Sequence, residues 1–165
     1  MLYNDFMKLS FEEKNEITDI EFEEGTKIID NNALAQYKKI KNIYIPATVE
    51  SIGTNVFAFT SIEKLIIPDS VKQIGWHMCT SCPNLKFVKI SDNIEKIGSF
   101  NFIGCDKLEK IFCKNRVFKE EAFLDAFIDN GGLEYSTEMT LDDILDLGVS
   151  LRDANRIFSS VNIDR

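Results

Sequence analysis

The sequence predicts an α/β repeat solenoid, a stack of about four to five units with helical segments at both ends. A unit of 22 or 23 residues recurs, and its copies begin at Ile17, Ile40, Ile62, Leu85 and, incompletely, Leu108. Within each copy, apolar residues two positions apart indicate a β-strand with one buried face. A fixed period of this length is typical of solenoids, because one unit cannot bury its apolar face alone and must stack on its neighbours.

Residues 1–16 are expected to form a helical N-terminal cap. Ser10 followed by Glu13 matches a capping box, with Phe11 and Ile17 as the apolar contacts. An open solenoid end would expose apolar side chains and unpaired backbone groups. We therefore expect this segment to cover the first repeat.

Residues 17–113 are expected to form the solenoid, with two apolar columns on the inner face of the first strand of each unit. The columns are Ile20, Ile43, Leu65, Val88 and Ile111, and two residues later Phe22, Ile45, Ile67, Ile90 and Cys113. Pro46 and Pro68 are expected to end the strands that precede them. A second apolar pair then ends in Gly53, Gly75 or Gly98, which should supply a backbone conformation that a side chain would hinder.

These runs resemble the BspA-type (Treponema pallidum-type) leucine-rich repeat. The residues that carry the resemblance are Ile43-Tyr44-Ile45-Pro46, Val49-Glu50-Ser51-Ile52-Gly53 and Leu65-Ile66-Ile67-Pro68, with Cys82 and Cys105 closing later units. The resemblance covers residues 17–113 and implies a leucine-rich-repeat stack. The first copy departs from the pattern, since Asp30 stands where glycine is expected and Glu23 where proline is expected. Such architectures serve many partners, so the resemblance specifies a fold more than a function.

The residues beside the inward column of each first strand are expected to point outward as one continuous strip, because stacked strands lie ~4.8 Å apart. A contiguous apolar patch is a candidate interaction surface, and aromatic residues are enriched in interface cores. The predicted partner-binding residues are Tyr44, Lys64, Ile66, Phe87, Lys89, Lys110 and Phe112, and Asn42 lies at the edge of the strip. The alternatives are that the C-terminal segment folds back over it, or that the pattern arises by chance.

Residues 114–165 are expected to leave the repeat and form three short helices. The first should end at Gly131-Gly132, and capping boxes at Thr140 with Asp143 and at Ser150 with Asp153 should begin the other two. These helices would form either a C-terminal cap or a small appended module.

No catalytic or metal-binding constellation is predicted, and no cofactor is implied. Cys79-x-x-Cys82 beside His77 could suggest zinc or redox chemistry. However, a structural zinc site usually needs four ligands, and the repeat places both cysteines in columns that should be buried. His77 is the only histidine and is expected in a surface turn. The paired acids Asp142-Asp143 and Glu120-Glu121 fall in the first turns of expected helices, where they favour the helix dipole.

The net charge of −8 is unevenly distributed. Residues 1–24 carry eight acids and two bases, residues 25–115 carry eight acids and twelve bases, and residues 116–165 carry eleven acids and five bases. Acidic ends oppose a polyanion, so nucleic-acid binding is not expected. With neither a secretory signal at the N-terminus nor a membrane span, we expect a cytoplasmic protein, or a surface or secreted one if a signal has been trimmed.

The function predicted from the sequence is a non-enzymatic protein–protein interaction module that binds its partner through the strip. Two alternatives remain at this stage. One is an acidic decoy or inhibitor of a nucleic-acid enzyme that acts through the acidic ends. The other is a structural subunit of a larger assembly. Neither the partner nor the oligomeric state follows from the sequence.

Overall fold

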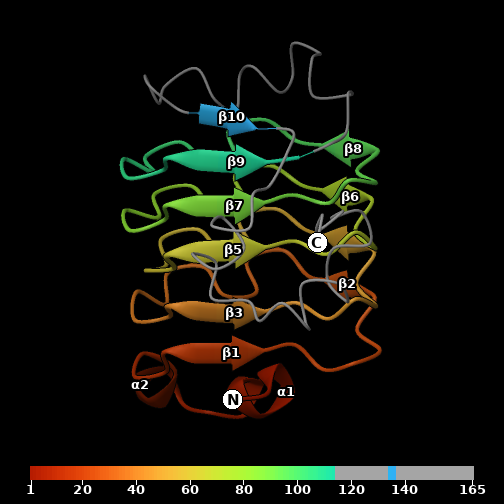
Figure 1. The fold of residues 1–165 in the computed structure, drawn as a ribbon. Helices are drawn as coiled ribbons and strands as arrows, with labels where there is room; N and C mark the ends of the chain where they lie inside the picture. Colours follow the sequence, from red (N-terminus) through yellow and green to blue (C-terminus); the bar gives the residue numbers. More distant parts are fainter. Residues whose placement is uncertain (114–133, 137–165) are drawn as a thin grey trace, which may run out of the picture.

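The computed structural model is a solenoid built from two parallel ladders of strands. Figure 1 shows longer strands stacked on one side and shorter strands stacked on the other. The structure describes residues 1–113 and 134–136. The solenoid agrees with the sequence prediction.

The elements follow the repeat along the chain. Two helices, α1 (Tyr3–Met7) and α2 (Phe11–Lys14), precede the strands. The longer strands are β1 (Asp19–Glu21), β3 (Asn42–Tyr44), β5 (Lys64–Ile66), β7 (Phe87–Lys89), β9 (Lys110–Phe112) and β10 (Glu134–Ser136). The two-residue strands are β2 (Ile28–Ile29), β4 (Ser51–Ile52), β6 (Gln73–Ile74) and β8 (Lys96–Ile97).

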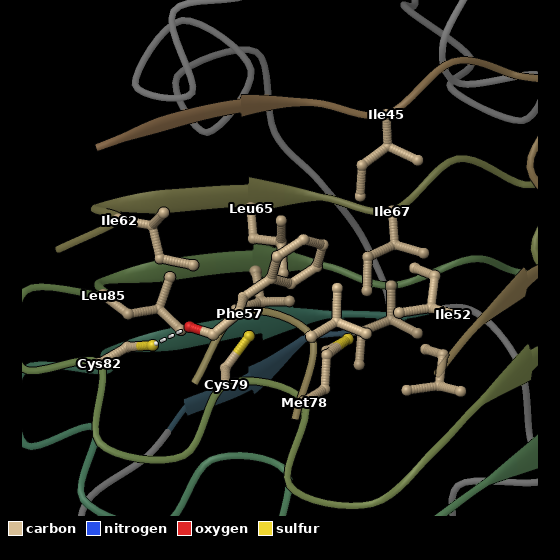
Figure 2. Close-up of a cluster of buried hydrophobic side chains, with 14 of the residues drawn as sticks. Ile45, Ile52, Phe57, Ile62, Leu65, Ile67, Met78, Cys79, Cys82 and Leu85 are labelled. Carbon is tan, nitrogen blue, oxygen red and sulfur yellow. Dashed lines mark hydrogen bonds between the residues drawn. The ribbon is translucent and has the colours of Figure 1, made fainter. Parts of the chain in front are cut away.

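The core lies between the two ladders and consists of the columns expected from the sequence. Leu65, Val88 and Ile111 are buried and pair in register across β5, β7 and β9. The second column, from Phe22 to Cys113, is buried throughout. Figure 2 shows Phe57 packed among the isoleucines and leucines of neighbouring units. Burial of such side chains contributes roughly 1.5–3 kcal/mol each, so the shared core is what holds single units together.

The longer strands do not form one uninterrupted sheet. Among the described residues, β1 pairs with β3, whereas β5, β7, β9 and β10 form a separate four-stranded sheet. The two-residue strands β2, β4, β6 and β8 pair continuously past this break. The Ser61 N–H also donates to the Ile40 carbonyl at 2.9 Å, so the last residue of the second unit is hydrogen-bonded to its first.

The turn segments that follow the two-residue strands form a third set of hydrogen bonds between units. The N–H groups of Asn55, Phe57 and Phe59 donate to the carbonyls of Trp76, Met78 and Thr80 of the next unit, at 2.8 or 2.9 Å. Two residues in each segment adopt positive φ. They form two ladders, Asn32, Asn55, His77 and Phe100, and four residues later Gln36, Phe59, Ser81 and Gly104. We infer that this backbone geometry aims successive N–H groups at the neighbouring unit.

The repeated glycines serve a different purpose from the one predicted. Gly53, Gly75 and Gly98 are not among the residues with positive φ. Instead, each approaches the preceding turn so closely that a side chain has no room: a Cβ on Gly75 would lie 2.7 Å from the backbone carbon and oxygen of Gly53. Likewise, a Cβ on Gly53 would lie 2.8 Å from the backbone nitrogen of Asn31. Asp30 begins this column and can be a larger residue because the first repeat has no preceding turn among the described residues.

The N-terminal segment lies below β1 (Figure 1). The predicted capping box is present, because the Ser10 side chain accepts from the Glu13 N–H and the Glu13 carboxylate accepts from the Ser10 N–H. The hydrogen bond that the Glu13 carboxylate accepts from the Ser10 N–H holds the pKa of Glu13 below its ordinary value. Phe6 is fully buried and meets the Tyr37 ring edge-on at 5.0 Å. Leu2 also forms a parallel bridge with Glu21.

One strand was not predicted from the sequence. β10 pairs with β9 in parallel, with Glu134 opposite Lys110 and Ser136 opposite Phe112. The strand ladder therefore continues beyond residue 113, the expected end of the solenoid. The three helices expected within residues 114–165 lie outside the described residues.

Replacing Gly75 by alanine should destabilise the fold, because the added Cβ would overlap the Gly53 backbone. We expect Gly75→Ala to lower the free energy of unfolding by about 1–3 kcal/mol, the usual cost of overpacking, as measured by urea denaturation. Asp30→Ala is the matched control at the equivalent position and should change it by less than ~0.5 kcal/mol. Equal effects of the two substitutions would contradict the close-approach explanation.

Candidate functional site

The strand strip consists of two rows of side chains that alternate with the inward columns. Lys64 pairs with Phe87, which pairs with Lys110, to form one row. Ile66, Lys89 and Phe112 form the second row in the same way. Tyr44 lies on β3, in the separate two-stranded sheet, so it is not in hydrogen-bonded register with Ile66. The expected single strip is thus continuous from β5 to β9 and interrupted between β3 and β5.

Exposure differs along the strip. Tyr44 is 44% exposed, whereas Lys64, Ile66, Phe87 and Lys110 are half-buried. Lys89 and Phe112 are only 4% and 1% exposed, contrary to the expectation that the whole strip faces solvent. The accessible part of the strip therefore lies on β3, β5, the first residue of β7 and the first residue of β9.

Lys89 is buried because its ammonium turns back toward two carboxylates. Its Nζ lies 3.3 Å from Asp69 Oδ1 and 3.0 Å from Asp92 Oδ1, and it donates to the Ile90 carbonyl. Asp69 and Asp92 follow equivalent strands, and the Asp92 N–H donates to Asp69 at 2.8 Å. The positive charge of Lys89 is therefore compensated within the chain. The sequence prediction that Lys89 selects an acidic partner does not fit this arrangement.

The cysteines are buried core residues, as the repeat columns predicted. Cys79, Cys82 and Cys105 have no exposed surface, and all four cysteines are free thiols. Cys82 donates to the Phe57 carbonyl at 3.1 Å (Figure 2), and Cys105 donates to the Cys79 carbonyl at 3.0 Å. Burial raises the pKa of the Cys79 thiol well above its ordinary value.

His77 lies in a turn, as expected, and adopts a φ of 57°. Its Nδ1 is 3.2 Å from the Thr80 hydroxyl, and its ring stacks on Phe100 with centroids 5.5 Å apart. Within residues 1–113 and 134–136, no group of three or more His, Cys, Asp or Glu side chains could hold a metal ion. In the same ranges, no helix is long and apolar enough to cross a bilayer.

Sequence reasoning missed a second group of exposed aromatic residues, on the turn segments. Phe59, Trp76 and Phe100 are exposed there, and Phe11 on α2 is exposed as well. Trp76 and Phe100 approach each other with centroids 6.4 Å apart. The available signal was their place in the repeat, since Phe59 and Phe100 stand in columns where other units have Ser81, Gly104 or Asn55.

The fold and its columns have a counterpart in a known family. The family model described as the BspA type leucine rich repeat region matches residues 5–128 with six copies. The chain belongs to this family. The match begins within α1, before the first copy found by inspection, and extends beyond β9.

Several solved structures have a similar fold. The pneumococcal vaccine antigen PcpA has a TM-score of 0.62 and 29% identity over 81% of this chain and 34% of its own. A leucine-rich repeat protein from Bacteroides ovatus ATCC 8483 has a TM-score of 0.55 and 24% identity over 60% of this chain and 26% of its own. The T. pallidum leucine-rich repeat protein has a TM-score of 0.53 and 21% identity over 58% of this chain and 45% of its own.

This chain therefore spans less than half of the length of each of these three proteins. The two relatives below 25% identity support the fold alone. A search of curated proteins found no significant match.

Lys89 should matter for stability more than for recognition. We expect Lys89→Met to lower the free energy of unfolding by about 3 kcal/mol, because two largely buried carboxylates would lose their shared cation. Lys86→Met, three residues earlier at an exposed position, should change it by less than ~0.5 kcal/mol. Chemical denaturation of both variants tests this, and a Lys89 variant as stable as wild type would show that the ion cluster is dispensable.

The buried thiols should be unreactive in the native protein. We expect Ellman's reagent to leave Cys79, Cys82 and Cys105 unmodified under native conditions and to modify them once the chain is denatured, because none has exposed surface. Mass spectrometry of the labelled protein identifies the sites. Rapid native labelling of Cys82 would contradict its assignment as a core residue.

Proposed function

We propose that this chain is a non-enzymatic protein-interaction module that binds another protein through the accessible part of the strand strip. The observation that supports this most directly is the regular row of side chains on β5, β7 and β9 in a family whose repeats usually mediate protein interactions. Tyr44, Ile66 and Phe87 would be the apolar anchors. Lys64 and Lys110 would favour an acidic partner.

The physical basis of the proposal is preorganisation. Each anchor is attached to a strand whose backbone is hydrogen-bonded to a neighbouring strand. Little backbone freedom is then lost on binding, so more of the contact energy contributes to affinity. Aromatic side chains such as Phe87 and Tyr44 bury a large area for few rotatable bonds. Phe112 and Lys89 are not included among the contact residues, because they are buried.

The remaining assignments form part of the same proposal. Residues 1–16 would cover the first repeat, residues 17–113 would form the binding solenoid, and residues 114–165 would form a C-terminal cap or module. Support for the first assignment comes from the burial of Phe6 and the contact between Tyr3 and Phe22, whose centroids are 4.7 Å apart. No cofactor or nucleic acid takes part in the proposed activity.

Loss of the Phe87 ring should weaken partner binding. The partner is first captured from a lysate of the source organism with the wild-type protein as bait, and its affinity is then measured by calorimetry. We expect Phe87→Ala to reduce the binding free energy by more than ~1 kcal/mol, as for a residue at the centre of an interface. Phe87 is half-buried and lies beside the inward-facing Val88 on β7, so the substitution should leave the packing of the Val88 column unchanged.

Phe100→Ala is the matched control, because it removes the same ring from a turn segment instead of the strip. It should leave the affinity unchanged. Equal affinity of the wild type and Phe87→Ala would place the binding surface elsewhere and would contradict the proposal.

A further inference from the structure

Phe59 occupies a backbone position that does not suit it. Its φ is 62°, in the left-handed region, and its side chain is 45% exposed. The left-handed conformation is unfavourable for most residues other than glycine and is better tolerated by asparagine. The requirement of the fold at this position is the Phe59 N–H, which donates to the Thr80 carbonyl at 2.9 Å. Any residue except proline supplies that group.

Other units satisfy the same geometry with smaller or more polar residues. Gln36, Ser81 and Gly104 stand at the equivalent position of the neighbouring repeats. A phenylalanine there adds backbone strain and leaves much of its ring in water, where it gains little burial energy. The backbone geometry therefore does not require phenylalanine here. Phe100 combines the same conformation with 39% exposure, so the surroundings of Phe59 are what distinguish it.

Phe59 does line a groove on the surface of the molecule. The groove has a volume of about 580 Å³ and lies between α2 and the turn segments of the first two repeats. Its lining residues are Phe11, Asn15, Glu16, Gln36, Lys38, Lys39 and Phe59. Phe11, from α2, is 70% exposed. Two aromatic side chains that contribute little to the core thus line the same depression.

The charges around the groove favour an anion. The Lys39 ammonium is 2.7 and 2.8 Å from the two oxygens of the Glu16 carboxylate, so these two groups largely neutralise each other. Lys38 has no ion-pair partner among the described residues, and it leaves the groove with one positive charge in excess. This local excess contrasts with the net charge of −8 on the whole chain.

We propose that this groove binds a short segment of another protein in which an aromatic or aliphatic side chain stands next to a carboxylate. The apolar side chain would lie against Phe59 and Phe11, and the carboxylate would pair with Lys38. The groove lies on α2 and the turn segments, away from β5 and β7, so this site is separate from the strand strip and does not depend on it. The chain would then hold two partner segments at different surfaces.

The test uses short random peptides displayed on phage and selected against the wild-type chain. Selected peptides are synthesised, and their affinities are measured by fluorescence anisotropy for the wild type, Phe59→Asn and Lys38→Glu. We expect enrichment of peptides with an apolar residue beside Asp or Glu. Phe59→Asn should weaken them by at least about tenfold, equivalent to 1.4 kcal/mol, and Lys38→Glu should weaken them as well.

Two controls separate a role in binding from a role in folding. Phe100→Asn makes the same change at another left-handed position outside the groove and should bind the peptides as the wild type does. Phe59→Asn should melt no lower than the wild type, because asparagine relieves the strain.

Four outcomes would overturn the proposal. They are the absence of any enriched peptide, peptides that bind Phe59→Asn as tightly as the wild type, a consensus with Lys or Arg in place of the acid, and a wild-type dimer that Phe59→Asn converts to a monomer. The last outcome, from light scattering, would assign the groove to a second copy of this chain.

Discussion

The close approach of each repeat to the previous one governs this structure. Backbone hydrogen bonds join successive units at three places: the longer strands, the two-residue strands and the turn segments. Gly75 and Gly98 lie so near the preceding turn that only a hydrogen atom fits at the Cα position facing it. Stacking this close aligns equivalent residues, so each sequence column becomes a physical row of side chains. Buried cysteines, alternating apolar residues and outward side chains all follow from that alignment.

Much of the fold could be predicted from the sequence because the inward columns are constrained by burial. Leu65, Val88 and Ile111 must be apolar in every unit, so their periodicity is visible without coordinates. The assignment of Cys79 and Cys82 to the core followed from the same columns. The structural reason for the repeated glycines could not be predicted in this way. A positive φ and a close backbone contact both favour glycine, so the sequence pattern is the same in either case. β10 was missed because the copy that begins at Leu108 departs from the repeat pattern after residue 113, although the family model extends to residue 128.

The candidate site was predicted less completely, since outward positions are free to vary. Alternation along a strand indicates which side chains leave the core, and it placed Phe87 and Lys64 correctly on the outer side of the strands. It carries no information on what an outward side chain then contacts. Lys89 is on the outer side, but its flexible chain reaches Asp69 and Asp92 and becomes a buried structural cation. Likewise, the strain at Phe59 depends on a backbone angle that no hydrophobic pattern reports.

The stack offers surfaces of different character around one rigid core. Stacked strands provide a flat, regular row, whereas the turn segments provide a groove where α2 meets the first repeats. Residues on either surface can change without disturbing the core, because the inward columns supply the stability. A family built on this unit can therefore change its outward residues while retaining its fold.

Hydroxyl-radical footprinting with and without the captured partner tests the central claim most directly, since it reports the solvent exposure of individual side chains. Tyr44 and Phe87 should lose reactivity when the partner binds, and Trp76 and Phe100 on the turn segments should retain theirs. Protection of Trp76 and Phe100 with Tyr44 and Phe87 unchanged would show that the strand strip is not the binding surface.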